Sequence, residues 1–161
     1  MNDSSPVGVP ADQQAGQWCQ EILEFSAGRR EILEITSAVD KVVARSGIQS
    51  GLCHIFIQHT SASLLLTENV DPAVHQDLES FMQRIIPDGL RGYVHNSEGP
   101  DDMPAHLRSV ITGSSLTIPV VETRLGLGTW QGIYLWEHRY HGRVRRVVVT
   151  VNGLSTGGLT S

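Results

Sequence analysis

The sequence has few cysteines, one lysine and no long apolar run, and each shortage excludes a class of protein. Cys19 and Cys53 are the only cysteines, so no disulfide framework is predicted and a reducing, cytoplasmic location is expected. Because Lys41 is the only lysine, Schiff-base chemistry would depend on that residue alone. No stretch approaches the roughly 18 apolar residues of a membrane span. The residues around Asp3 lack the basic-then-apolar pattern of a signal peptide.

Acidic residues outnumber basic ones, 17 to 12, and the net charge of -5 argues against a nucleic-acid partner. With 161 residues, 40% of them hydrophobic and 18% charged, the chain is expected to form one domain with its own core. Residues 1–17 are polar and rich in glycine and proline, which is typical of a flexible tail. We expect a folded domain over 18–153 and a second tail over 154–161.

Sixteen glycines between short apolar runs favour strands joined by tight turns. The apolar patterns predict strands over 18–25, 31–36, 52–60, 115–121, 129–140 and 143–151. We expect the first two strands to form a hairpin around 26–28, and His141-Gly142 to connect the last two. Because strands and helices do not alternate regularly, an antiparallel sandwich or partial barrel is favoured over a doubly wound fold.

Three helices are predicted between these strands. Ser37 and Gly47 could cap the first, and Asp71 followed by Pro72 opens the second, which ends at 87–89. The third runs from Pro104 to Ile111. Their predicted buried residues are Val39, Val42 and Val43; Val74, Leu78, Phe81 and Ile85; and Leu107, Val110 and Ile111. In the strand 52–60, alternation places Cys53, Ile55 and Ile57 on one buried face that ends at His59.

Seven histidines are many for this length, although no short metal-binding motif is present. His59 ends a strand, His95 opens a polar loop, His106 lies in a short helix, and His138 follows Glu137 on an apolar strand. Such residues can meet at one rim of an antiparallel sheet, and imidazoles beside a carboxylate form a divalent-metal site. The alternative is that each is a hydrogen-bonded structural residue, the interpretation given to His54, His75 and His141.

Other polar groups suggest an anion site. Asn69 and Asp71 lie at a predicted helix start, which attracts phosphate, although Asp71 can simply cap the helix. The string Gly128-Thr129-Trp130-Gln131-Gly132 could form a pocket floor or a tight turn with a core tryptophan. Arg139, Arg143, Arg145 and Arg146 could bind phosphate through their guanidinium groups, but Arg145 and Arg146 point to opposite faces of a strand.

Six strings occur together in this order: HTSASL (59–64), ENxDP (68–72), YxHNxEG (93–99), DMPAHL (102–107), LGTWQG (127–132) and EHR (137–139). With them, the sequence resembles the YjbQ family (UPF0047) from about residue 18 to residue 153. The resemblance implies a mainly β fold with short helices, a jelly-roll-like antiparallel β-sandwich. It also implies a homotrimer with sites near subunit contacts.

The same resemblance implies a secondary thiamine-phosphate synthase activity, which couples hydroxymethylpyrimidine diphosphate to thiazole phosphate and releases pyrophosphate. On this hypothesis a divalent metal, zinc or alternatively magnesium, neutralises the leaving group. The expected metal ligands are His95, His106 and His138. The expected catalytic residues are His59, Glu98, Asp102 and Arg139. The expected substrate-binding residues are Asn69, Asp71, Gly128, Thr129, Trp130 and Gln131.

Two other functions remain open for the same site. One is a metal-dependent hydrolase of phosphorylated metabolites, in which a metal-bound water is the nucleophile. The other is a non-catalytic trimer that binds a small molecule. The expected partners are a phosphorylated small-molecule substrate and further copies of the chain in a homotrimer, with no membrane partner, and the net charge of -5 disfavours nucleic acid in every version.

Overall fold

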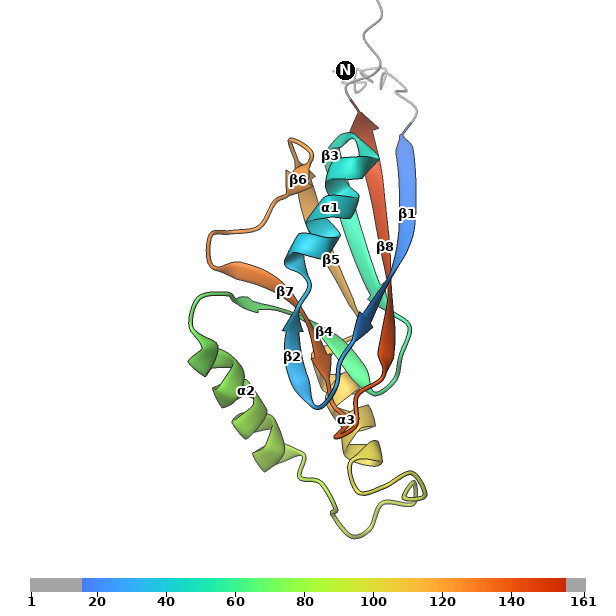
Figure 1. Ribbon diagram of the computed structural model, residues 1–161, viewed down its shortest axis with the longest axis vertical. Helices are drawn as coiled ribbons and strands as arrows, with labels where there is room; N and C mark the ends of the chain where they lie inside the picture. Colours follow the sequence, from blue (N-terminus) through green and yellow to red (C-terminus); the bar gives the residue numbers. More distant parts are fainter. Residues whose placement is uncertain (1–15, 156–161) are drawn as a thin grey trace, which may run out of the picture.

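The computed structural model describes residues 16–155, which form eight strands and three helices (Figure 1). The predicted tails, 1–17 and 154–161, lie mostly outside the described residues. In chain order the elements are β1 (Gln17–Ser26), β2 (Glu31–Glu34), α1 (Thr36–Ser46), β3 (Ile48–Ile57), β4 (Ala62–Glu68), α2 (Pro72–Ile85), α3 (Asp102–Thr112), β5 (Ser115–Val121), β6 (Arg124–Leu125), β7 (Gln131–Glu137) and β8 (Val144–Ser155).

The strands form two antiparallel sheets, with the orders β1-β8-β3-β5-β6 and β2-β7-β4. The predicted mainly β, antiparallel class with short helices is confirmed, and the jelly-roll arrangement stays a prediction. The predicted hairpin between the first two strands is wrong, because β1 pairs with β8 and β2 pairs with β7. Pairing with β8 engages all ten residues of β1, whereas the four residues of β2 would leave most of its backbone groups unpaired. Similarly, β7 and β8 follow each other in the chain but belong to different sheets.

The main core lies between the two sheets and α1. Ile55 and Val149 of the larger sheet, Leu64 and Leu135 of the smaller sheet, and Val42 of α1 belong to this one buried cluster. The predicted alternation in β3 is confirmed, since its odd-numbered residues from 53 to 57 are buried. Burial raises the pKa of the Cys53 thiol to about 12.

Two of the predicted helix caps are confirmed and one is wrong. The Asp71 side chain accepts a hydrogen bond from the backbone of Ala73, and Gly47 ends α1 in the left-handed conformation that glycine adopts readily. The first helix begins at Thr36, however, and Ile35 occupies the N-cap position without a side-chain cap. Ser37 therefore lies inside the helix.

Helices α2 and α3 belong to the second apolar cluster, on the other face of the smaller sheet (Figure 1). Met82 and Ile86 of α2 pack there against Trp136 of β7. The predicted stripe on α2 is confirmed in its first half, where Val74 and Leu78 are half-buried, but it is wrong further on, since Phe81 is 51% exposed and Ile85 is 48% exposed. Trp136 packs against Met82 and Ile86, and this contact sets the rotation of α2 about its own axis.

The predicted packing of α3 is also partly wrong. Val110 and Ile111 are exposed, and Arg108 and Ser109 are buried in their place. Arg108 Nη1 donates to Glu79 Oε1 of α2 at 2.9 Å, and Ser109 Oγ donates to the Ala62 carbonyl at 2.8 Å. Polar partners on α2 and β4 therefore decide which face of α3 points inward.

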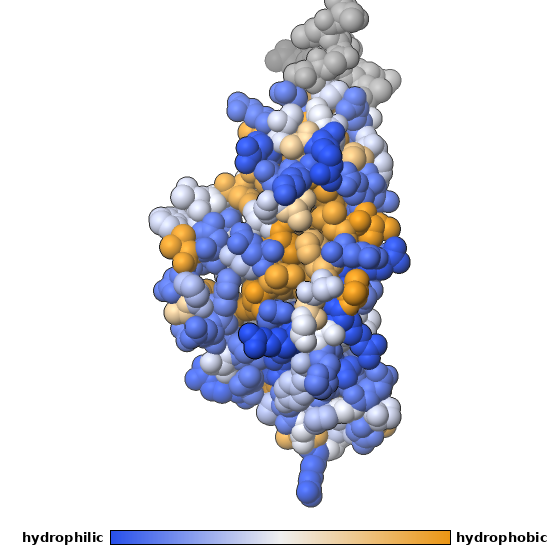
Figure 2. Space-filling model, viewed as in Figure 1, coloured by the Kyte–Doolittle hydropathy of each residue, from blue (hydrophilic) through white to orange (hydrophobic). Residues whose placement is uncertain are grey.

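Apolar side chains gather at mid-height on the side of the molecule that carries α1, whereas its ends are mainly hydrophilic (Figure 2). The opposite face of the larger sheet bears the exposed side chains of Trp18, Ile22, Leu52, Phe56 and Val121. Within the described residues, no helix is both long and apolar enough to cross a membrane.

Candidate functional site

A cavity of about 400 Å³ opens at the end of the molecule where β3 leads into β4, α3 begins and β7 leads into β8. The structure brings together five predicted site residues there: His59, Glu98, Asp102, His106 and Arg139. The other lining residues are Gln58, Thr60, Ser61, Arg143 and Arg145. Residues that are far apart in the sequence thus share one small, strongly charged space.

His95, Asp102 and His106 form an imidazole–carboxylate cluster beside this cavity. Their donor atoms lie within 4.8 Å of one another, the only such group of three or more His, Cys, Asp or Glu residues within 16–155. Asp102 Oδ2 is 2.7 Å from His95 Nε2 and 3.5 Å from His106 Nε2. Asp102 opens α3 and His106 follows one turn later, so helical spacing places both on the same side of the helix.

The His106 ring has its protonation pattern set by the backbone. Its Nδ1 lies 2.9 Å from the Thr60 carbonyl, which can only accept, so Nδ1 carries the proton. In the neutral ring, Nε2 is then a free lone pair directed at the Asp102 carboxylate. Two electron-rich atoms face each other at this point, an arrangement that a proton or a cation between them would stabilise.

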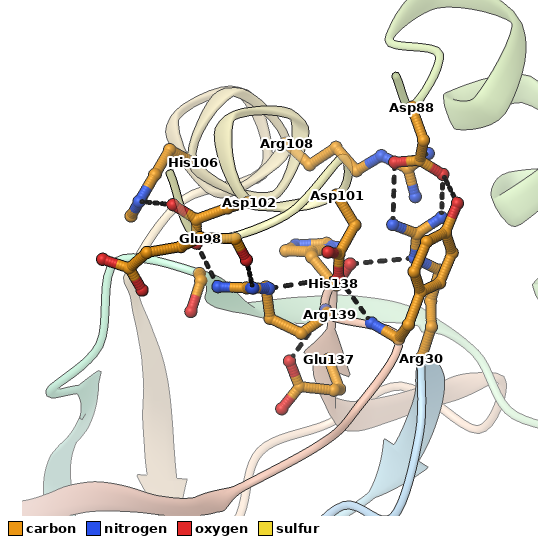
Figure 3. Close-up of polar contacts among 12 residues, drawn as sticks. Arg30, Asp88, Glu98, Asp101, Asp102, His106, Arg108, Glu137, His138 and Arg139 are labelled. Atoms are coloured by element: carbon orange, nitrogen blue, oxygen red, sulfur yellow. Dashed lines mark hydrogen bonds and ion pairs between the residues drawn. The ribbon is translucent and has the colours of Figure 1, made fainter. Parts of the chain in front are cut away.

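Arg139 fixes the acidic side of the cluster (Figure 3). Its Nε donates to Asp101 Oδ2 at 3.1 Å, its Nη1 donates to Asp102 Oδ1, and its Nη2 donates to the Glu98 carbonyl at 2.8 Å. All three nitrogens are therefore engaged within the chain. Within one chain Arg139 orients the buried Asp102 carboxylate, and its predicted contact with phosphate stays a prediction.

Arg145 forms the floor of the cavity and is held by Glu137, which sequence reasoning did not select. The guanidinium Nε and Nη2 each donate to the Glu137 carboxylate at 2.6 Å, and Nη2 also donates to Ser61 Oγ at 3.1 Å. Arg145 is buried and Arg146 is exposed, which confirms that they point to opposite faces. The only sequence signal for Glu137 is its place before His138 and Arg139.

His138 is not part of the imidazole–carboxylate cluster, so the structure brings together two of the three predicted histidine ligands, His95 and His106, with Asp102. His138 is fully buried, its Nε2 lies 2.8 Å from Ser63 Oγ, and its Nδ1 has no partner among the described residues. Burial, assisted by the positive charges of Arg108, Arg30 and Arg145, lowers the pKa of His138 to about 3. His138 therefore stays neutral inside the protein and contributes to its structure.

His59 reaches the cavity from the connection between β3 and β4. Its Nε2 accepts a hydrogen bond from the backbone of Arg146 at 2.9 Å, so its proton lies on Nδ1. Burial lowers the pKa of His59, and the charges of Arg145 and Arg146 lower it further. His59 is therefore a neutral ring that can donate, but not accept, through Nδ1.

The six predicted substrate-binding residues lie elsewhere in the chain: Asn69, Asp71, Gly128, Thr129, Trp130 and Gln131. They surround the opposite ends of β4 and β7, about 20 Å from the cavity at roughly 3.3 Å per strand residue. There they support local structure. The Asn69 side chain donates to the Thr129 and Gln131 carbonyls, and the Gly128 N–H donates to the Gln131 side chain. One chain alone does not bring them to the cavity.

Comparison with known proteins identifies the family. Residues 21–154 match the family model described as "UPF0047 protein YjbQ-like". The chain belongs to this UPF0047 family. The UPF0047 protein sll1880 of Synechocystis is 48% identical over 134 residues, which cover 83% of this chain and 91% of that protein. The UPF0047 protein YjbQ of Escherichia coli is 44% identical over 137 residues, which cover 84% of this chain and 99% of that protein.

Solved structures of related UPF0047 proteins have the same fold. A YbjQ-like protein of unknown function from Sulfolobus solfataricus matches with a TM-score of 0.79 at 28% identity, over 86% of this chain and 99% of that one. An uncharacterized YjbQ/UPF0047 protein from Clostridium acetobutylicum matches with a TM-score of 0.72 at 34% identity, over 83% of this chain and 98% of that one. Both proteins therefore share the arrangement of strands and helices seen in this chain.

Proposed function

We propose that the cavity is the active site of a transferase that binds a diphosphate-bearing small molecule beside a divalent cation. The proposed reaction is that of a thiamine-phosphate synthase, as a secondary activity. The observation that carries the proposal is the meeting of Arg143 and Arg145 with the His95–Asp102–His106 cluster at one cavity. A diphosphate requires cationic groups, and its departure is assisted by a divalent metal.

Arg145 is suited to bind an anion because the protein has already fixed its orientation. Its bonds to Glu137 use Nε and Nη2, which leaves Nη1 without a partner in the described part of the chain. Arg143 lines the same cavity and is exposed. A preorganised cation of this kind stabilises the negative charge that develops on a leaving diphosphate, and it needs no reorganisation when the reaction occurs.

The cluster fits a divalent metal in its chemistry. Two imidazole nitrogens and one carboxylate oxygen are the donors that catalytic zinc sites use, and the carbonyl of Thr60 sets the His106 tautomer as a second-shell partner does. We assign His95, Asp102 and His106 as the ligands, with zinc preferred over magnesium because of the two imidazoles. A metal bound there would supply positive charge to the leaving diphosphate.

In the proposed reaction the bond between the pyrimidine methylene carbon and the diphosphate oxygen breaks, and its electron pair leaves with the diphosphate. The ring nitrogen of the thiazole phosphate supplies the electron pair of the new carbon–nitrogen bond, so no proton is transferred. Arg143 and Arg145 bind the departing anion, and the His59 Nδ1–H can donate to it. Glu98, whose side chain is exposed at the cavity, faces the developing positive charge of the methylene group.

Hydrolysis of the same phosphorylated substrates is the competing reaction, and it requires a group that accepts a proton from water. The His59 lone pair is already occupied by the Arg146 N–H. This hydrogen bond removes His59 as the acceptor and leaves the exposed Glu98 carboxylate as the candidate at the cavity, so product analysis decides between transfer and hydrolysis. A non-catalytic binding protein would bind the same ligands without turnover.

Self-association is part of the proposal. The outer face of the larger sheet carries exposed Trp18, Ile22, Leu52 and Phe56, and apolar residues of this kind are enriched at subunit contacts. We infer that this face forms the contacts of a homotrimer with the expected jelly-roll-like sandwich as its subunit. Cys19 and Cys53 are free thiols, which supports a cytoplasmic location.

The test combines elemental analysis with turnover of the two thiamine precursors, with and without a chelator. Stoichiometric zinc and chelator-sensitive formation of thiamine phosphate are expected. His106→Ala should lose the metal, whereas His141→Ala, which changes an exposed histidine outside the cavity, should keep it. Release of inorganic phosphate without formation of the coupled product would show that the reaction is hydrolysis and not transfer. Full metal content in the His106 variant would refute the ligand set.

A further inference from the structure

A second chamber lies on the other side of His95. The segment between α2 and α3, residues 87–101, closes on itself where the Gly89 N–H donates to the Pro100 carbonyl at 2.9 Å. Between this loop and the start of α3 is a cavity of about 470 Å³, to which His95 contributes. Small-ligand sites have volumes of about 300–1,000 Å³, so the chamber has room for an organic molecule.

Both ends of the loop are fixed, so the chamber has a stable base. Asp88 at one end receives two hydrogen bonds from Arg30, at 2.6 and 2.9 Å, and one from the Tyr140 hydroxyl at 2.7 Å. Asp101 at the other end receives the Tyr140 backbone N–H at 2.7 Å and Arg139 Nε at 3.1 Å. Tyr140 therefore connects both ends of the loop to the start of the β7–β8 connection.

The chamber wall combines three kinds of side chain. Tyr93 and Met103 are half-buried and provide an aromatic and a polarizable apolar surface. Asn96 offers an amide that donates and accepts. Arg91 is exposed and forms no ion pair with any residue in 16–155, so its charge is free for a ligand. This set suits a planar heterocycle that carries an anionic group.

His95 places this chamber next to the first cavity. Its ring lines the chamber, while its Nε2 lies 2.7 Å from Asp102, which lines the arginine-containing cavity. Ligands in the two spaces would therefore border the same imidazole–carboxylate cluster, at His95 from the chamber and at Asp102 and His106 from the cavity. A hydrolase needs only water as its second reactant, and a water occupies about 30 Å³. The chamber is far larger than one water molecule, so it has room for a second organic substrate.

We propose that the loop chamber is the binding site of the acceptor substrate, a phosphorylated heterocycle whose anionic group pairs with Arg91. This inference rests on the proposed transferase function and specifies where its second substrate binds. The diphosphate occupies the arginine-containing cavity, the acceptor occupies the loop chamber, and the reacting atoms meet at the cluster. The two ligands consequently bind together rather than in competition.

Isothermal titration of the full chain tests this, with hydroxyethylthiazole phosphate as the acceptor probe and pyrophosphate as the diphosphate probe. The wild-type protein should bind the thiazole phosphate equally well with and without saturating pyrophosphate. Arg91→Ala should weaken thiazole phosphate binding about tenfold, the effect of one lost charge-assisted hydrogen bond, and leave pyrophosphate binding unchanged. Arg143→Ala should weaken pyrophosphate binding and leave thiazole phosphate binding unchanged.

Arg84→Ala is the matched control, because it removes an exposed arginine of α2 that lines neither cavity. Equal effects of Arg91→Ala and Arg84→Ala, competition between the two probes, or no saturable thiazole phosphate binding would each overturn the proposal. The proposed function fails differently, through absent pyrophosphate binding or absent coupled product. If thiazole phosphate binds in a way that depends on Arg91 but no coupled product forms, the loop chamber is confirmed as a binding site and the proposed reaction is refuted.

Discussion

Glu137 and Arg145 form a two-point ion pair, with both nitrogen–oxygen distances at 2.6 Å, in which the side chains are 0% and 3% exposed. The pair joins the end of β7 to the start of β8, two strands of different sheets. Because Arg145 is also the floor of the cavity, the same contact connects the two sheets and orients a cation toward the site.

Neutralising Glu137 should therefore destabilise the whole fold. Glu137→Gln keeps the size of the side chain but leaves the Arg145 charge buried without a counter-charge, and we expect the free energy of unfolding to fall by about 3 kcal/mol. Urea denaturation measures this. Glu24→Gln is the control, since Glu24 is exposed and lies 3.7 Å from Arg146, and it should unfold like the wild type. Similar denaturation midpoints for both variants would contradict the prediction.

His138 should make stability depend on pH. Its pKa of about 3 in the folded protein lies below the ordinary value of 6.5, so the unfolded chain binds more protons between these values. The stabilisation is complete above pH 6.5 and is lost as the pH falls toward 3. Down to about pH 5, where few carboxylates titrate, the loss should approach about 1 kcal/mol per pH unit.

The measurement for His138 is the free energy of unfolding at several pH values between 7 and 5. His138→Gln, which does not titrate, should give a flatter profile, whereas His141→Gln should retain the wild-type slope because His141 is exposed. A wild-type slope in the His138 variant would show that another group causes the pH dependence.

Gly142 allows two chain connections to pass close to each other beside the site. A Cβ at this position would lie 1.8 Å from the Ala27 carbonyl oxygen, which is backbone and cannot rotate away. Gly142→Ala should cost roughly 1–3 kcal/mol and displace the connection that carries Arg139 and Tyr140. Thermal unfolding checks the cost. Gly28→Ala, where nothing lies within 4 Å of the added Cβ, should have a melting temperature near that of the wild type.

Local features of the fold could be predicted because their causes are local. The alternation from Cys53 to Ile57 and the left-handed Gly47 depend on side chains a few residues apart. The partners of β1 and β2, and the rotation of α3 that buries Arg108, depend on distant chain segments. A pattern of apolar residues cannot distinguish a buried arginine with a partner from an exposed one.

In the candidate site, too, some features have local causes and others depend on distant parts of the chain. His59, Asp102 and His106 were predictable as polar residues at the ends of elements, and they do meet at one cavity. His138 has the same residue type and a similar position, but its side chain points to Ser63 inside the protein. Strand β4, which contains Ser63, is absent from the predicted strands because threonine and serine residues such as those at 60–63 are typical of turns. Without that strand, the environment of His138 could not be predicted.

The connection of Asp88 and Asp101 through Tyr140 has a consequence for redesign. A segment whose two ends are anchored by side chains of the body can be exchanged without moving its anchor points. Residues 90–94, which include Arg91 and Tyr93, could thus be grafted from one UPF0047 protein to another, while His95, Glu98 and the ion pairs at 88 and 101 stay in place. Substrate preference would then be transplantable separately from the chemistry, and loop-swap chimeras would be the natural starting library for engineering this fold.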